Sequence, residues 1–196
     1  FTSLMAEARE IKKPSKDPMS RVNAIINHKE YQDWIIANNQ AEYGSEYCRH
    51  GLEHAFDVAR IAYELWLDHQ GNPVAKDIVY AAALLHDIGY WSNFEDLHEH
   101  GGHDEDCDCH DHDCGCEEEE SAFQVGASLA EEILLDAGYH PAVIGEIQKA
   151  IRNMDHIGAD GLSAVLRRAN ELSRPCFLCP MRQKCAKEPK NLRLEY

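Results

Sequence analysis

The residues of this 196-residue chain best suited to chemistry are His54 and the adjacent pair His86 and Asp87. The pair follows residues 78–85, an almost wholly apolar stretch that predicts a helix buried on most sides. Burying an imidazole and a carboxylate without partners costs several kcal/mol, which a bound cation would offset. These donors suit divalent metals, and three protein ligands leave room for a water whose pKa the ion lowers. We therefore predict a catalytic metal site here; the alternative is core side chains satisfied by ordinary hydrogen bonds.

Three further side chains have the chemistry to handle a phosphate ester at such a site. His50 lies one helical turn before His54, so the two share a helix face and His50 could protonate a leaving group. Arg49 and Arg174 could each donate two hydrogen bonds to a phosphate, with Arg49 assisting catalysis and Arg174 binding substrate. The alternative interpretation is a set of surface charges near an exposed helix start.

Helical periodicity predicts the elements that would position these residues. The apolar residues of 51–68 fall on one face, and the same spacing predicts helices at 121–137, 141–151 and 160–172. Asp17 and Pro18 predict the start of a first helix of about 20 residues. No stretch alternates apolar and polar residues over the length of a strand, so the predicted fold class is all-α.

The sequence around the predicted ligands resembles the HD-domain superfamily of metal-dependent phosphohydrolases. Two stretches carry the resemblance, Gly51-Leu52-Glu53-His54-Ala55-Phe56-Asp57-Val58-Ala59-Arg60 and Ala83-Leu84-Leu85-His86-Asp87-Ile88-Gly89. The resemblance spans about residues 20 to 175 and implies a compact helical bundle. It also implies that His54, His86 and Asp87 bind a divalent ion (Mn, Mg, Fe, Co or Zn) and that Asp87 orients or deprotonates the attacking water.

The late helix departs from the family pattern at Asn170, where similar proteins carry an aspartate as the last metal ligand. An amide oxygen can still coordinate but brings no charge, so we expect a less tightly held ion and treat activity as an open question. Family members with two metals carry additional histidines. Ser121 and Ala122 stand at the first of these positions and His156 is an uncertain match to the second, so we predict one metal.

A second set of metal-binding residues lies in the C-terminal tail, 176–196. Cys176, Cys179 and Cys185 form a C-x2-C-x5-C array, and Cys48, which precedes the helix bearing His54, is the natural fourth ligand. Four thiolates suit a structural zinc ion or an iron–sulfur cluster, and spacing alone does not decide between them. Some small bacterial HD-domain proteins are similar in this tail. The alternative is reduced thiols in a loose tail.

The remaining segments complete the predicted domain organisation. Residues 1–18 are expected to be a disordered leader, 19–175 the helical domain, and 176–196 a tail packed on it. Residues 97–120 form a low-complexity insertion rich in His, Cys and acids, which we expect to be disordered; it either supplies or buffers metal or is simply solvated.

Charge and hydropathy narrow the possible partners. Thirteen of the 35 acidic residues lie at 95–120 with no Lys or Arg, so the formal charge of −16 leaves only −3 for the rest of the chain. No basic stretch interleaved with aromatics suggests binding to duplex nucleic acid. No apolar run reaches the length of a bilayer span and no secretory signal is present, so we expect a cytoplasmic protein. The oligomeric state is not determined by the sequence.

Two functional hypotheses follow. The first is a phosphohydrolase that cleaves a small phosphate ester, for which nucleotides are candidates, with metal-activated water. The second is a catalytically inactive protein that binds or buffers metal, in which Asn170 has removed turnover and the His/Cys insertion is the functional part.

Overall fold

The computed structural model describes residues 17, 19–70, 75–94, 120–156, 158–188 and 190–193. The predicted leader and insertion therefore lie outside the described residues, apart from Asp17 and Glu120. The described chain contains seven α-helices and no strand, which confirms the all-α class. The helices are α1 (Ser20–Ile26), α2 (Lys29–Ala41), α3 (Leu52–Gln70), α4 (Lys76–Leu85), α6 (Ala122–Asp136), α7 (Pro141–Arg152) and α8 (Gly161–Leu172), with 3-10 helices η1 (Tyr90–Phe94) and η2 (Cys176–Leu178).

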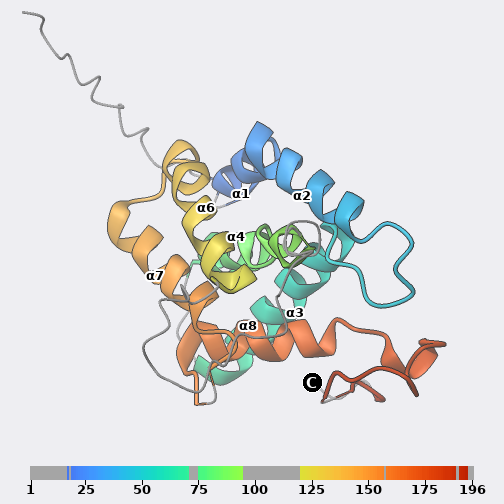
Figure 1. Ribbon diagram of the computed structural model, residues 1–196. Coiled ribbons are helices and arrows are strands. Elements are labelled where there is room, and N and C mark those ends of the chain that lie inside the picture. Colours follow the sequence, from blue (N-terminus) through green and yellow to red (C-terminus); the bar gives the residue numbers. More distant parts are fainter. Residues whose placement is uncertain are drawn as a thin grey trace, which may run out of the picture.

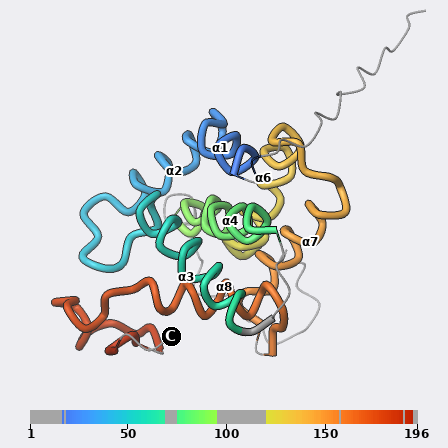
Figure 2. Tube along the Cα trace, turned by 180° about the vertical axis from the view of Figure 1, so that it is seen from behind, coloured from blue at the N-terminus to red at the C-terminus, as the bar shows by residue number. Residues whose placement is uncertain are grey.

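Helix α4 lies in the middle of the bundle, with α1 and α2 on one side and α8 on the other (Figures 1 and 2). It contacts α1, α3, α6, α7 and α8. Val79 and every residue from Ala81 to Leu85 are buried, as the apolar stretch predicted. The three alanines allow neighbouring helices to approach closely, while each buried leucine contributes about 1.5–3 kcal/mol. The residues that follow α4 therefore begin deep inside the protein.

The prediction of a single first helix of about 20 residues is wrong. Helix α1 ends at Ile26 and α2 begins at Lys29, because His28 has an extended backbone with ψ of 131°. Side chains donate hydrogen bonds to carbonyl groups at the end of α1. Asn27 Nδ2 donates to the Asn23 carbonyl at 2.7 Å, and Gln32 Nε2 donates to the Ile26 carbonyl at 3.0 Å. The apolar spacing of the two helices looks continuous, but local side-chain hydrogen bonds divide them.

A close approach joins α6 to the turn after α4. A Cβ atom on Gly89 would lie 2.5 Å from both the Ala122 carbonyl oxygen and the Gly126 backbone nitrogen. Helix α6 begins just there, with Ser121 and Gln124 forming a reciprocal capping box. Glycine is therefore required at position 89 for α6 to cover the turn that carries Asp87.

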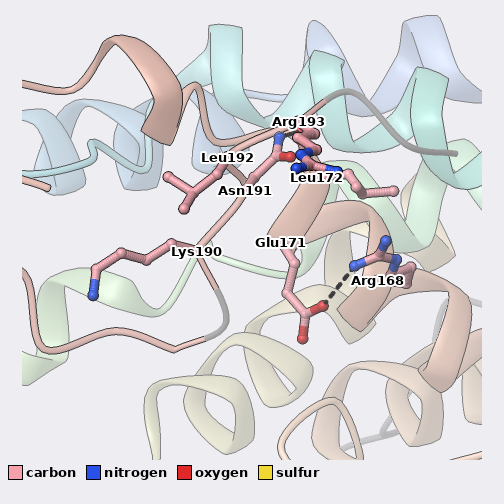
Figure 3. Close-up of a pocket in the computed structure, with 7 residues that line it drawn as sticks. All are labelled: Arg168, Glu171, Leu172, Lys190, Asn191, Leu192 and Arg193. Carbon is pink, nitrogen blue, oxygen red and sulfur yellow. Dashed lines mark hydrogen bonds and ion pairs between the residues drawn. The ribbon is translucent and has the colours of Figure 1, made fainter.

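The C-terminal tail returns to the end of α8. Asn191 Nδ2 donates to the carbonyl oxygens of Leu172 at 2.7 Å and Arg174 at 3.0 Å. Figure 3 shows the groove between this part of the tail and α8, where Arg168 and Glu171 form an ion pair of 3.4 Å. The groove is lined by Arg168, Glu171, Leu172, Lys190, Asn191, Leu192 and Arg193. None of the predicted metal ligands lines it.

No helix in the described ranges combines the length and the apolar character needed to cross a bilayer.

Candidate metal centre

The fold brings together three side chains that are distant in sequence. His54 comes from the first turn of α3, and His86 and Asp87 directly follow α4. One ligand atom of each lies within 4.8 Å of the other two. Asp87 Oδ2 is 2.8 Å from His86 Nε2 and 3.3 Å from His54 Nε2. His86 is fully buried and Asp87 is 6% exposed, so water does little to screen the electrostatic interaction between these groups.

The other ring nitrogen of each histidine already has a hydrogen-bond partner. His86 Nδ1 lies 2.6 Å from the Ala83 carbonyl oxygen, to which it can only donate. Ser173 Oγ donates to the Asn170 carbonyl at 2.8 Å, which leaves its oxygen to accept from His54 Nδ1 at 3.3 Å. With Nδ1 protonated in both rings, each neutral imidazole presents the lone pair of Nε2 to the centre of the site. This is how proteins orient histidines that bind metals.

The three atoms at the centre fit a divalent cation. His54 Nε2, His86 Nε2 and Asp87 Oδ2 are all buried and none has a hydrogen-bond partner. Three electron-pair donors facing one another in a low-dielectric interior repel each other unless a positive charge lies among them. A divalent ion accepts all three pairs at once, and two imidazoles with one carboxylate are a suitable ligand set.

The electrostatics of the three groups agree with this fit. Burial lowers the pKa of His86, but the Asp87 carboxylate outweighs burial and leaves that pKa raised. Burial favours a higher pKa for Asp87, yet the charge of His86 and the close approach of both imidazole rings hold that pKa well below its usual range. Burial lowers the pKa of His54, which keeps that imidazole neutral. The centre thus attracts positive charge, and a metal ion can take the place of a proton.

Asn38, which was not predicted from the sequence, fixes the backbone around the site. Its side chain is fully buried. Nδ2 donates to the Asp87 carbonyl at 2.8 Å and to the His50 carbonyl at 3.3 Å, and Oδ1 accepts from the Trp91 backbone at 2.8 Å. One sequence signal could have found it, because position 38 continues the buried stripe of Tyr31 and Ile35 on α2.

His50 is held by Glu42, a second residue absent from the sequence-based predictions. Glu42 Oε1 is 2.5 Å from His50 Nδ1, and Oε2 accepts from the His50 backbone nitrogen at 2.8 Å. Tyr90 stacks on the imidazole with ring centroids 3.6 Å apart, and the His54 ring lies 5.5 Å away. Both members of the Glu42–His50 pair are 3% exposed. The pair closes the loop of residues 43–49 at both ends.

A cavity of about 830 Å³ lies beside His54, between the loop before α3 and the start of the tail. Arg49, which is exposed, and Arg174, which is half-buried, both line it. His50, His86 and Asp87 are buried and are not among the lining residues. The lining consists of Asn39, Glu46, Tyr47, Cys48, Arg49, Gly51, Leu52, Glu53, His54, Asp57, Ser173, Arg174, Pro175, Cys176, Leu178, Cys179 and Pro180.

Asn170 is buried on α8, and its side chain is engaged by an arginine. Arg174 Nη2 donates to Asn170 Oδ1 at 3.1 Å. The Asn170 carbonyl binds Ser173, which in turn contacts His54, so Asn170 is two hydrogen bonds from the predicted ligand. Asp155, another residue absent from the predictions, follows α7 and is exposed, and partial desolvation and the charge of Asp87 both raise its pKa. The neighbouring His156 is exposed.

The four predicted cysteine ligands lie near one another. All four are half-buried and unpaired, and all line one small cavity. In the part of the chain that the structure describes, however, His54, His86 and Asp87 alone bring three such ligand atoms within 4.8 Å. The thiols are therefore neighbours at a wider spacing than the ligands of one ion.

Comparison with known proteins gives two matches. Residues 51–169 match the HD domain family, which confirms the resemblance proposed from the sequence. The match includes His54, His86 and Asp87 and ends directly before Asn170. An uncharacterized protein of Clostridium beijerinckii is 29% identical over 180 residues, which cover 91% of this chain and the whole of that protein. No solved structure matches the chain significantly.

Proposed function

Because the chain belongs to the HD-domain family, we propose that it is a metal-dependent phosphohydrolase acting on a small phosphate ester, with nucleotides as the first candidates. Proteins of this family are generally phosphohydrolases. The observation that carries the proposal is the group of three buried ligand atoms within 4.8 Å of one another, none of which has a hydrogen-bond partner.

His54, His86 and Asp87 would hold the ion, and the chemistry of these donors suits Mn, Mg, Fe, Co or Zn. A divalent ion there supplies a lowered pKa for water and a positive charge for a phosphoryl oxygen. Asp87 is the ionised carboxylate nearest the centre, and it orients the attacking water or removes its proton. Asn170 remains a candidate ligand, since an amide oxygen bound by Arg174 keeps a second lone pair.

The cavity beside His54 is the proposed substrate site. Its volume of about 830 Å³ suits a ligand of nucleotide size. Arg49 and Arg174 line it and are proposed to bind the phosphate, where a planar guanidinium can donate two parallel hydrogen bonds. Asn170 orients Arg174 through the 3.1 Å hydrogen bond to its side-chain oxygen.

His50 is proposed to assist departure of the leaving group. Its Nδ1 is fixed by Glu42, so Nε2 is the nitrogen that could deliver a proton. We assign Glu42 a positioning role. It holds both the imidazole and the backbone nitrogen of His50, at the base of the loop that carries Arg49.

We also propose that Cys48, Cys176, Cys179 and Cys185 bind a zinc ion or an iron–sulfur cluster. Their shared cavity and their neighbouring positions support this.

The test of the proposed activity is a panel of nucleotides and generic phosphate esters, assayed with Mn, Mg, Co, Fe or Zn added to untagged protein. Metal-dependent release of phosphate is expected, and it should vanish in Asp87→Ala but survive deletion of residues 97–120. Failure of every ester with every metal, or full activity in Asp87→Ala, would overturn the proposal.

A further inference from the structure

The tail after α8 lacks the apolar burial that normally holds a segment in place. Among the described residues from 173 to 193, Asn191 alone is buried. The larger apolar side chains point outward, with Phe177 36%, Leu178 78% and Leu192 54% exposed. Fixing the backbone of each residue costs about 1–2 kcal/mol, which this segment does not recover from a hydrophobic core. Something other than packing must stabilise its turns.

The turns of the tail bring its cysteines to the cavity that Cys48 also lines. The Cys179 backbone nitrogen donates to the Cys176 carbonyl at 3.2 Å, closing the turn between the first two thiols, and Cys185 closes another with Met181 at 3.0 Å. Cys48, from the loop before α3, lines the same small cavity as these three cysteines. Burial raises the pKa of the Cys48 thiol, and Cys176 and Cys179 are close enough to raise it further. Three chain segments thus contribute thiols to one space.

The surroundings suit a group of negative charge. Basic side chains line the same cavity: Arg174, Arg182, Lys187 and Lys190. Four thiolates around a zinc ion or around a [4Fe–4S]²⁺ core leave a net charge of about −2. Charge complementarity therefore favours a metal–thiolate group over four neutral thiols, but it does not choose between the two metals.

The spacing of the thiols favours the cluster over a single ion. Zinc–sulfur bonds of about 2.3 Å in a tetrahedron put the sulfurs about 3.8 Å apart. No three of these sulfurs, all from described residues, lie within 4.8 Å of one another, although all four line one cavity. Thiolates that bind separate irons at the corners of a cluster stand further apart than the ligands of one ion. We propose that these four cysteines bind one [4Fe–4S] cluster, which fastens the tail to the loop before α3.

The test uses the whole protein purified without oxygen. A broad absorbance band near 400 nm and about four irons and four sulfides per chain are expected. Both should be lost in Cys48→Ser and in Cys179→Ser, with helical content retained. The matched control replaces the chain's other four cysteines, Cys107, Cys109, Cys114 and Cys116, with serine and should keep the band.

Proteolysis tests the fastening role without relying on phosphohydrolase activity. Trypsin should leave the tail intact in the loaded protein but cut it at Arg182, Lys184 or Lys187 once the cluster is removed by oxygen and chelator. One zinc per chain with no visible band, or a band that is lost only in the control variant, would overturn the cluster. Equal cleavage with and without the cluster would overturn its fastening role.

Discussion

The two groups of candidate metal ligands are built by different means. His54, His86 and Asp87 project from helices whose neighbours are the hydrophobic core, and their ligand atoms already lie within 4.8 Å of one another. The cysteines come from a loop and from a tail with no buried apolar side chain in its described part, and their sulfurs are more widely spaced. The core therefore positions the first site before any ion binds, whereas on our proposal the second site needs its metal group to hold the chain in place.

This contrast implies a division of tasks. A site positioned by the core can lose its ion and keep its geometry, as suits a catalytic metal. A site whose metal group holds the chain together loses its geometry when that group leaves, as expected for a structural metal. The two sites are nevertheless adjacent, because Cys48, Cys176 and Cys179 line the same cavity as His54.

The largest expected effect is on turnover, and it comes from mutating one of the two sites while leaving the other intact. His86→Gln should lower kcat/KM for a phosphate ester by at least about 100-fold, because a lost metal ligand removes several kcal/mol of transition-state stabilisation. It should leave the 400 nm band and the trypsin resistance of the tail unchanged. Cys179→Ser should lose the band and mainly raise KM, since Arg174 lies close to the cluster ligands. Loss of the 400 nm band in His86→Gln, or loss of kcat together with the band in Cys179→Ser, would contradict the separation of the two sites.

Metal addition should stabilise the core through the first site alone. A divalent ion at 100 times its Kd is expected to raise the free energy of unfolding by about 2.7 kcal/mol. Chemical denaturation of chelator-treated protein, with and without added Mn, measures this. Asp87→Asn should show no such gain, whereas Asp33→Asn, on the exposed face of α2, should respond like the parent protein.

Two glycine-to-alanine substitutions, one of them a control, test how tightly the core constrains the turn at Asp87. Gly89→Ala should destabilise the protein by about 1–3 kcal/mol, because its Cβ would lie 2.5 Å from backbone atoms of α6. The control Gly145→Ala on α7 meets nothing within 4 Å and should stabilise by roughly 0.5–1 kcal/mol. Denaturation midpoints measure both. Equal tolerance at the two positions would show that the turn is less constrained than the structure indicates.

The smallest expected effect concerns Asn170, which is linked to Arg174 by one hydrogen bond and to His54 through Ser173. Asn170→Asp adds a negative charge beside His54 and Arg174, so the ion should bind about 10-fold more tightly. Calorimetric titration with Mn measures the change. If turnover occurs only in this variant, the native chain is better described as an inactive metal-binding protein.

Local pattern predicted most of the helices, and residue chemistry together with the HD-domain resemblance predicted the central candidate metal ligands. The apolar stretch at 78–85 and the one-sided stripe at 51–68 correspond to α4 and α3, because helix formation and burial depend on spacing that can be read along the chain. His54 and the His86–Asp87 pair were found because their residue types are costly to bury without a cation. The break between α1 and α2 was missed, since side-chain hydrogen bonds rather than hydropathy cause it.

The tertiary structure decided which polar residues support the site. Asn38 lies 49 residues from Asp87, and Ser173 lies 119 residues from His54, so no local pattern connects them. Glu42 is close to His50 in sequence, but only the closed loop brings both of its oxygens to that residue. The spacing of the four thiols is likewise a property of the folded chain. Residue types determine which chemistry is available, whereas distances between remote side chains follow from the packing of the whole bundle.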